Sequence, residues 1–273
     1  MKANCIDVST WQRDIDWKKV KAAGIKAVII RAGFGTTKDN QFENHYKGAK
    51  AAGLFIGAYW YSYAYSVADA EKEAKACLSA LNGRRLDLPV YYDMEEDSQM
   101  SLGKSVMTSM ACRFIDTVIA GGYRGGMYSS PSWFTDFLDY DLLRLKYSIW
   151  LAHWASSHSR ACDIWQYGEN GSIDGVNGDV DVNIIENEDV LGNKTAILDK
   201  HGFTKGNASD GVLALKELLI LAKKKGVITQ GVDENNIFGD GTEKAVNQVL
   251  KLGGYAQNGI AGEGFIKFIS KKL

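Results

Sequence analysis

The stretch Leu88-Pro89-Val90-Tyr91-Tyr92-Asp93-Met94-Glu95-Glu96 places an acidic cluster directly after a short apolar run. The apolar run predicts a buried strand, and Asp93 and Glu95 follow at its end. Because side chains alternate across an extended backbone, these two carboxylates leave it on the same side. Like charges held close together raise one pKa, which leaves a proton donor beside an ionised partner. Acid-assisted cleavage of a glycosidic bond requires such a pair. A solvated acidic turn or a cation-binding loop is the alternative for an isolated Asp-x-Glu.

Length and composition set the outer limits of the interpretation. A chain of 273 residues suits one large domain plus a small one. The net charge of −1 and the apolar fraction of 45% are those of an ordinary globular protein, with no charge excess that would attract nucleic acid. The apolar stretches are too short to span a membrane. The start of the chain has no apolar core of signal-peptide length, so we expect synthesis in the (host) cytoplasm without a signal peptide.

The cysteines and histidines do not indicate a cofactor or a metal site. The four cysteines lack C-x-x-C spacing, and in a domain of this size they are expected to be buried thiols rather than disulfides: Cys5, Cys77, Cys112 and Cys162. The four histidines form no H-E-x-x-H set: His45, His153, His158 and His201. No glycine-rich phosphate-binding motif follows any predicted strand. We therefore expect an enzyme without cofactor or metal.

The aromatic residues divide the chain into two parts. All seven tryptophans lie at or before Trp165, and every tyrosine except Tyr255 lies at or before Tyr167. A change of composition of this kind indicates two domains, separated by a segment rich in Gly, Asn, Lys, Thr and Ser. We predict a first domain over residues 1–187, a linker over 188–208 and a second domain over 209–273.

The first part alternates between strand-like and helix-like segments. The predicted strands include residues 26–32, 54–61, 88–93, 123–128, 147–152 and 162–166. The predicted helices between them are residues 16–23, 42–52, 67–81 and 104–120. Such alternation is typical of a parallel sheet, and about eight strands in a segment of this length favour a closed barrel. The fold class is therefore α/β: a TIM-like (β/α) barrel with a small, mainly α-helical domain after it. An open, doubly wound sheet is the alternative.

Polar and aromatic side chains gather where the predicted strands end, the position at which such barrels carry their chemistry. The carboxylates are Asp7, Asp93, Glu95 and Asp181. The residues expected to contact substrate are Tyr59, Tyr61, Tyr128, Trp150 and Gln166. Any one of these aromatic residues is more often part of a core than of a site. Together they indicate a sugar-binding rim, because aromatic rings stack on pyranose faces while carboxylates bind hydroxyl groups.

Seven stretches, spread over residues 3–187, carry a family resemblance. They are Ile6-Asp7-Val8-Ser9 with Trp11-Gln12, Ile15-Asp16-Trp17, Val28-Ile29-Ile30-Arg31-Ala32-Gly33, Gly57-Ala58-Tyr59, Asp93-Met94-Glu95, Ile164-Trp165-Gln166-Tyr167 and Val180-Asp181-Val182-Asn183. In these stretches and their order, the chain resembles the family 25 glycoside hydrolases. These are lysozymes that cut the β-1,4 bond between N-acetylmuramic acid and N-acetylglucosamine in peptidoglycan, and their barrel is an irregular TIM-like one.

Three positions depart from the family pattern. Cys5 stands where glycine is common, Arg13 where glycine often follows Trp-Gln, and Trp60 where histidine is frequent. None of these changes removes a carboxylate. We expect Trp60 to alter how a sugar stacks beside Tyr59.

The resemblance implies a role for each carboxylate. Glu95 takes the place of the general acid/base. Asp93 and Asp181 take the places that orient the substrate's own acetamido group and stabilise charge, and Asp7 binds substrate or hydrogen-bonds to them. Cleavage with retention is implied, although a covalent carboxylate nucleophile would give the same outcome. A peptidoglycan-binding adaptor without turnover and a chitinase-like hydrolase are the alternative functions.

The tail resembles a small helical peptidoglycan-binding module. It keeps the turn and helix start Ile237-Phe238-Gly239-Asp240-Gly241-Thr242-Glu243-Lys244-Ala245-Val246, and Gly262-Glu263-Gly264-Phe265 resembles a degenerate second copy of the turn. Asn247-Gln248 departs from the usual Phe-Gln. The resemblance implies binding to the bacterial cell wall, and self-association through a helical dimerisation domain is the alternative. Without a leader peptide, a phage endolysin is favoured over a secreted autolysin.

Overall fold

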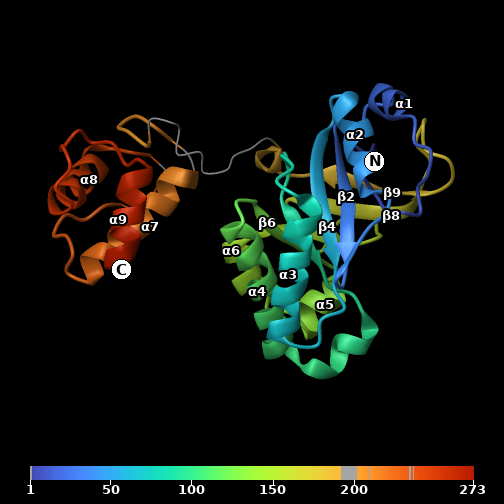
Figure 1. Ribbon diagram of the computed structural model, residues 1–273, viewed down its shortest axis with the longest axis horizontal. Helices are drawn as coiled ribbons and strands as arrows, with labels where there is room; N and C mark the ends of the chain where they lie inside the picture. The colour runs from blue at the N-terminus through green and yellow to red at the C-terminus, as the bar shows by residue number, and fades with distance from the viewer. Residues whose placement is uncertain (1, 192–201, 209, 234, 236) are drawn as a thin grey trace. The chain divides into compact units, whose positions relative to one another are not determined.

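The protein consists of two compact units, Met1–Asn193 and Lys194–Leu273 (Figure 1). The computed structural model describes residues 2–191, 202–208, 210–233, 235 and 237–273. Each unit has a hydrophobic core of its own. The predicted linker over residues 188–208 includes residues 192–201, which lie outside the described residues.

Eight strands of the first unit close into a barrel. They are β1 (Cys5–Val8), β2 (Ala27–Phe34), β4 (Phe55–Tyr61), β5 (Val90–Asp93), β6 (Gly125–Ser129), β7 (Ser148–Ala152), β8 (Ile164–Gly171) and β9 (Val180–Ile185). Their order is β1-β9-β8-β7-β6-β5-β4-β2, and the pairing of β1 with β2 completes the ring. The short strand β3 (Thr37–Lys38) pairs antiparallel with the end of β2. The predicted TIM-like barrel is confirmed, and the open sheet is wrong because β1 has a partner on both sides.

One strand of the barrel runs against the others. β9 pairs antiparallel with both β1 and β8, whereas the other pairings around the ring are parallel. The alternation of strands and helices predicted a parallel sheet, and β9 is the exception to it. The reason is the connection over residues 172–179, which contains no helix among the described residues and is too short for a parallel crossover.

Helices cover the outside of the barrel (Figure 1). They are α1 (Trp17–Ala22), α2 (Phe42–Ala51), α3 (Val67–Leu81), α4 (Lys104–Ala120), α5 (Pro131–Asp136) and α6 (Tyr140–Lys146), with the 3-10 turns η1 (Asp97–Leu102) and η2 (Glu188–Val190). Side-chain caps begin several of them: the Asp16 carboxylate accepts from the backbone of α1, and the Ser66 hydroxyl accepts from Asp69 at the start of α3. α3 and α4 pack side by side.

Aromatic rings fill the interior of the barrel beneath the rim. Tyr59, Tyr91 and Tyr128 surround Trp150, with ring centroids 5.9, 5.4 and 4.4 Å from its own. Gly126 on β6 makes room for them, because a Cβ atom there would overlap the Tyr91 ring. This inner core fixes the strands that carry the rim.

Trp60 lies on the other face of β4 from Tyr59. Its side chain is buried outside the barrel, in the core that lies between the strands and the helices and also contains Tyr92. Its indole Nε1 donates to Gly35 O at 2.9 Å. The expectation that Trp60 alters sugar stacking beside Tyr59 is therefore wrong. Alternation along the strand points the two rings in opposite directions.

The second unit is helical, with α7 (Asp210–Lys224), α8 (Asp240–Leu252) and α9 (Glu263–Lys272) packed around one core. Isolated β-bridges join Phe203 to Ala261 and Ala208 to Ile237. The Lys216 ammonium is buried and donates to the side chains of Asp233 and Asn235. A buried charge needs such partners.

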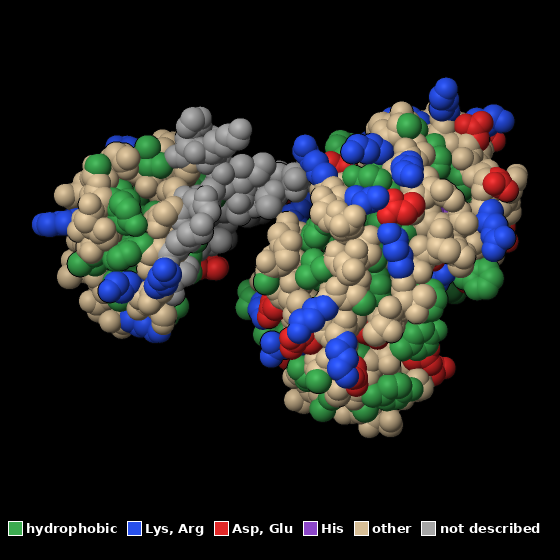
Figure 2. All heavy atoms as spheres, in the orientation of Figure 1, with side chains coloured by type: hydrophobic (Ala, Val, Ile, Leu, Met, Phe, Trp, Pro, Cys, Tyr) green, Lys and Arg blue, Asp and Glu red, His purple; other side chains and the backbone are tan. Residues whose placement is uncertain are grey.

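Three general features complete the description. No described helix has both the length and the apolar character needed to span a bilayer. All four cysteines are free, but only Cys5 and Cys77 are buried; the prediction of buried thiols is wrong for Cys112 and Cys162, which are partly exposed. On the face drawn in Figure 2, the Lys and Arg side chains of the first unit lie among Asp and Glu side chains, whereas the charged side chains visible on the second unit are mostly Lys.

Candidate active site

The four predicted carboxylates meet at one rim of the barrel. Asp7 lies near the end of β1, Asp93 is the last residue of β5, and Glu95 follows it. Asp181 is the second residue of β9 and stands opposite Asp7 in register. It reaches the same rim because β9 is reversed, so that the beginning of this strand lies beside the ends of the others. We call Asp7, Asp93, Glu95 and Asp181 the acidic rim.

Amide side chains hold Asp7 in place. Its Oδ2 accepts hydrogen bonds from Gln166 Nε2 at 3.1 Å and from Asn183 Nδ2 at 2.8 Å. Asn183 is oriented in turn by Trp150, whose Nε1 donates to Asn183 Oδ1 at 2.8 Å. Asp7 also shares a hydrogen bond with Asp181. The buried Trp150 therefore positions a carboxylate through one intervening side chain.

The acidic rim retains protons at neutral pH. Burial raises the pKa of Asp7, and burial followed by the charge of Asp7 raises the pKa of Asp181 to about 9. Burial and the charges of Glu95 and Asp7 hold the pKa of Asp93 well above its usual range, although the Arg31 guanidinium acts in the opposite direction. Carboxylates forced together share protons because they cannot all ionise.

Glu95 has a pKa of about 7, raised first by burial and then by the charges of Asp7 and Glu96. Its side chain is nevertheless exposed at the rim, where a substrate would reach it. The sequence predicted Asp93 as the neighbouring charge responsible, and in the structure Asp7 is the larger influence. The predicted ionised partner, Asp93, itself favours the protonated form.

One oxygen of the acidic rim has no partner. Among the described residues, nothing donates to the buried Oδ1 of Asp93. A buried carboxyl oxygen without a hydrogen bond is costly, and such atoms are often reserved for a ligand.

The five residues predicted to contact substrate separate into two groups. Tyr59 and Tyr61 are partly exposed at the rim. Tyr128, Trp150 and Gln166 are buried, and Trp150 is only 1% exposed, so its ring has no free face. The Tyr128 hydroxyl donates to Gln166 Oε1 at 3.0 Å, and Tyr128 lies close enough to Glu95 to act against the rise in the pKa of that carboxyl group.

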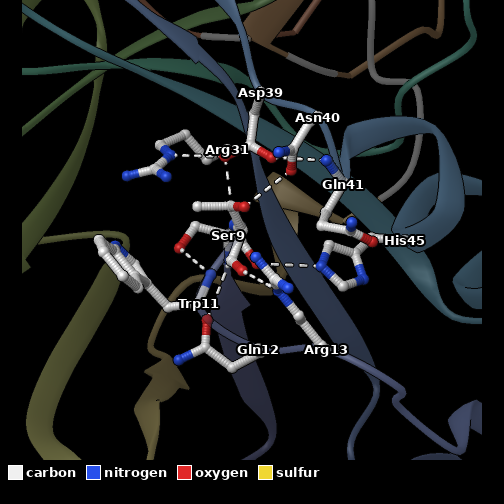
Figure 3. A network of polar contacts seen from close by, with 10 residues as sticks. Ser9, Trp11, Gln12, Arg13, Arg31, Asp39, Asn40, Gln41 and His45 are labelled. Atoms are coloured by element: carbon white, nitrogen blue, oxygen red, sulfur yellow. Dashed lines mark hydrogen bonds and ion pairs between the residues drawn. The ribbon is translucent and has the colours of Figure 1, made fainter.

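A network of polar contacts holds the loop that follows β1 beside Asp7 (Figure 3). The Asp39 carboxylate accepts from Arg31 Nε at 2.8 Å and from the Thr10 backbone at 3.2 Å, and His45 Nε2 lies 3.0 Å from Ser9 O. This network fixes the loop that presents Trp11, which is 80% exposed. Trp11 and Trp154, both exposed, were not among the aromatic residues predicted for the rim.

Other residues that support the rim were also missed. The alternation of Asp181 and Asn183 on one strand would have placed both on one face, so that signal was available. The Arg31–Asp39 ion pair could not be predicted from the sequence, because its two residues meet only once β2 and the loop have folded.

Among the described residues, no three His, Cys, Asp or Glu side chains are arranged to hold a metal ion.

The family model for glycosyl hydrolases family 25 matches residues 6–176, more than half of the chain. The chain belongs to glycosyl hydrolase family 25. This family 25 protein is therefore a glycoside hydrolase of the lysozyme type, and the acidic rim lies within or directly beside the matched segment.

Relatives of known structure or name agree with this assignment. The autolytic lysozyme of Clostridium acetobutylicum is 28% identical over 255 residues, which are 91% of this chain and 73% of that one. The catalytic domain of endolysin ply40, from a bacteriophage of Listeria monocytogenes, is 27% identical with a TM-score of 0.61, over 70% of this chain and 96% of the domain. The modular autolysin LytC of Streptococcus pneumoniae, solved with a synthetic peptidoglycan ligand, shares the fold at 24% identity and a TM-score of 0.60, and this chain spans 46% of its length.

Proposed function

We propose that the first unit is an N-acetylmuramidase that cuts the β-1,4 bond between N-acetylmuramic acid and N-acetylglucosamine in bacterial peptidoglycan. The observation that carries this proposal is the acidic rim, in which the exposed Glu95 carboxyl group, with a pKa of about 7, stands beside the buried Asp7 and Asp93 and the partly exposed Asp181. The names of the similar lysozymes and autolysins support the choice of substrate.

In this proposal, Glu95 is the general acid/base. With a pKa of about 7 it is substantially protonated at neutral pH, so it has a proton for the oxygen of the leaving sugar. The same carboxylate then accepts a proton from the water that completes hydrolysis. The Tyr128 hydroxyl, which donates to Gln166, lies near Glu95 and acts against the rise in the pKa of its carboxyl group.

Asp93 and Asp181 support the charge that develops at the anomeric carbon. The unpartnered Oδ1 of Asp93 is available to accept the N–H of the substrate's acetamido group, which would aim the acetamido oxygen at that carbon. Asp7 holds Asp181 through their shared hydrogen bond. Attack by the acetamido oxygen followed by attack of water retains the anomeric configuration.

The stereochemical proposal is tested by an NMR time course of the first product. We expect the retained anomer, and the inverted anomer as first product would contradict both the acetamido route and a covalent aspartyl route. A substrate whose acetamido group carries electron-withdrawing fluorines separates the two routes. Its cleavage should slow if the acetamido oxygen is the nucleophile and stay near the normal rate if a carboxylate is.

Glu95→Gln tests the acid/base assignment, because it keeps the shape of the side chain and removes the proton. We expect the release of reducing ends from soluble glycan to fall by about 10²- to 10⁴-fold. Asp97→Asn is the matched control, since Asp97 is an exposed acid in the same segment. Activity of Glu95→Gln within a few-fold of the wild type would exclude Glu95 from this role.

The same assay separates the alternative functions. A wild-type protein that sediments with peptidoglycan but releases no reducing ends would be a binding adaptor. Faster cleavage of acetylated chitin oligomers than of muramic-acid-containing glycan would indicate a chitinase-like enzyme.

We further propose that the second unit binds the cell wall and that the protein acts as a phage endolysin. The similarity to the endolysin ply40 domain supports the latter. Expression in a host cell with and without a membrane-permeabilising protein tests whether the protein acts as a phage endolysin. We expect lysis only when the membrane is opened, and lysis by the protein alone would favour a secreted autolysin.

A further inference from the structure

The segment that follows β4 exposes its aromatic residues and buries its small ones. In Tyr61-Ser62-Tyr63-Ala64-Tyr65-Ser66, Ser62 and Ala64 are buried, whereas Tyr63 is 49% and Tyr65 is 52% exposed. This reverses the usual preference, in which the large rings are the residues that become buried. We call Tyr61, Tyr63 and Tyr65 the tyrosine row.

A buried polar network fixes the backbone of the tyrosine row from beneath. Glu73 of α3 is buried, and its carboxylate accepts from the Tyr63 backbone at 2.8 Å and from the Tyr92 hydroxyl at 2.7 Å. Gln99 Nε2 donates to Ser62 Oγ at 2.9 Å and to Ala64 O at 2.8 Å. The exposed rings therefore stand on a rigid base rather than on a mobile loop.

A second set of contacts restrains the hydroxyl ends of the row. The Tyr65 hydroxyl donates to Ser98 Oγ at 2.6 Å, and Ser98 Oγ donates to Glu96 Oε1 at 3.0 Å. The Tyr61 hydroxyl donates to Glu96 Oε2 at 3.2 Å. These contacts involve the hydroxyl groups of Tyr61 and Tyr65, and about half of the Tyr63 and Tyr65 surfaces stay accessible.

The tyrosine row is continuous with the acidic rim. The charges of Asp93 and Glu95, after burial, raise the pKa of Tyr61, so this ring lies close to both carboxyl groups. The Tyr61 and Tyr63 ring centroids are 5.1 Å apart. The row therefore starts at the acids and extends outward along the chain to Tyr65.

We propose that Tyr63 and Tyr65 form a sugar-binding platform for pyranose rings of the glycan strand that lie beyond the bond being cut. The inference rests on the proposed function, because it takes the glycan at the acidic rim as its starting point. A strand held there continues past the rim as further pyranose rings, whose apolar faces suit a rigid aromatic surface. Rings fixed before binding lose little conformational entropy when a sugar stacks on them.

The double variant Tyr63→Ala/Tyr65→Ala tests the platform on two soluble substrates, a long muramic-acid-containing strand and a fragment of two repeats. We expect the KM for the long strand to rise by about tenfold, on the order expected for losing two ring contacts, with kcat unchanged. The short fragment should show little change. Phe55→Ala is the matched control, because Phe55 is 39% exposed at the opposite end of β4, and it should affect neither substrate.

Tyr63→Phe/Tyr65→Phe separates stacking from hydrogen bonding. These variants keep both rings and should bind the long strand almost as the wild type does. A loss as large as that of the alanine variant would overturn the platform in favour of hydroxyl contacts. An equal loss on both substrates, or no loss on the long strand, would also overturn it.

Calorimetric binding of the long strand to Glu95→Gln, with and without the tyrosine-to-alanine changes, keeps this test independent of turnover. If the wild type cuts neither glycan, the proposed function fails. In that case, weaker binding of the uncut strand after the alanine changes would still support the platform, and unchanged binding would overturn it.

Discussion

At the scale of single residues, the acidic rim is a balance between the repulsion of its carboxyl groups and the side chains that hold them together. Asn183 and Gln166 donate to Asp7, and Arg31 opposes the rise in the pKa of Asp93. Hydrogen bonds to a carboxylate favour its charged form, whereas burial and like charges disfavour it. The balance of these effects therefore differs from one acid to the next, although all four share one rim.

The pH dependence of cleavage follows from the acid form of Glu95. Its pKa of about 7 means that the proton needed by the leaving sugar is present below this pH and is lost above it. We expect kcat/KM on soluble glycan to fall as the pH rises through about 7. A rate that increases through this range would contradict the acid role, and Asp97→Asn should leave the profile in place.

Asp181 makes the folded protein less stable as the pH rises. Its folded pKa of about 9 lies above the usual value of about 4 for an unfolded aspartate, so its contribution to stability is complete below the lower value and is lost as the pH rises to the higher one. We expect Asp181→Asn, whose amide can donate to Asp7, to raise the melting temperature at pH 8 more than at pH 5. A difference from wild type that does not vary with pH would contradict this account.

The sequence located the residues of the rim better than it located their supports. The strand-end rule placed Asp7, Asp93 and Glu95 at one edge, and the structure brings them together with Asp181, which lies near the start of β9 rather than at a strand end. It did not predict that Trp150 would be buried and orient Asn183, because burial depends on the neighbouring strands. The Arg31–Asp39 pair likewise exists only once β2 and the following loop have folded.

At the scale of elements, small residues in one strand make space for large rings in the next. Gly126 of β6 faces the Tyr91 ring, and a Cβ atom there would also approach Ser148 O. Tyr91 contacts Trp150, which supports the acidic rim. Packing inside the barrel is thereby connected to the position of Asp7 through Asn183.

Gly126→Ala is therefore expected to destabilise the barrel. Overpacking of a filled interior costs about 1–3 kcal/mol, since Tyr91 and Trp150 must shift to admit the methyl group. The free energy of unfolding in urea measures this effect. Gly168→Ala is the control, because its Cβ would meet Val182 only at ordinary contact distance; an equal loss in both variants would exclude overpacking as the cause.

The elements themselves show what periodicity reveals and what it does not. The predicted helices over 67–81 and 104–120 coincide with α3 and α4, whose apolar faces repeat clearly. The short helices α5 and α6 were missed, because one or two turns give little periodicity. A strand carrying Asp181 was predicted, but the sequence pattern carries no information on strand direction, so the reversal of β9 was not predicted.

At the scale of the whole molecule, the two units have separate hydrophobic cores. The acidic rim and all seven tryptophans belong to the first unit. If the second unit holds the wall, it increases the local concentration of the first at an insoluble substrate without taking part in the reaction.

A protein truncated after Asn193 tests this division of labour. We expect it to keep its activity on short soluble glycan and to lose much of its activity on intact walls. Release of reducing ends from both substrates is the measurement. Equal loss on both would mean that the second unit completes the site or the fold, and no loss on either would favour a structural or dimerisation role.

The closure of the barrel by β9 has a consequence for synthesis on the ribosome. β1 is among the first segments to be made, but its second neighbour is complete only at Ile185, near the end of the first unit. Until then, one edge of β1 has no strand to pair with, and an unpaired edge can pair with another chain. Contacts between such distant segments form slowly. A nascent chain that stalls before residue 180 should therefore be prone to aggregation, even though most of the sheet has already been synthesised.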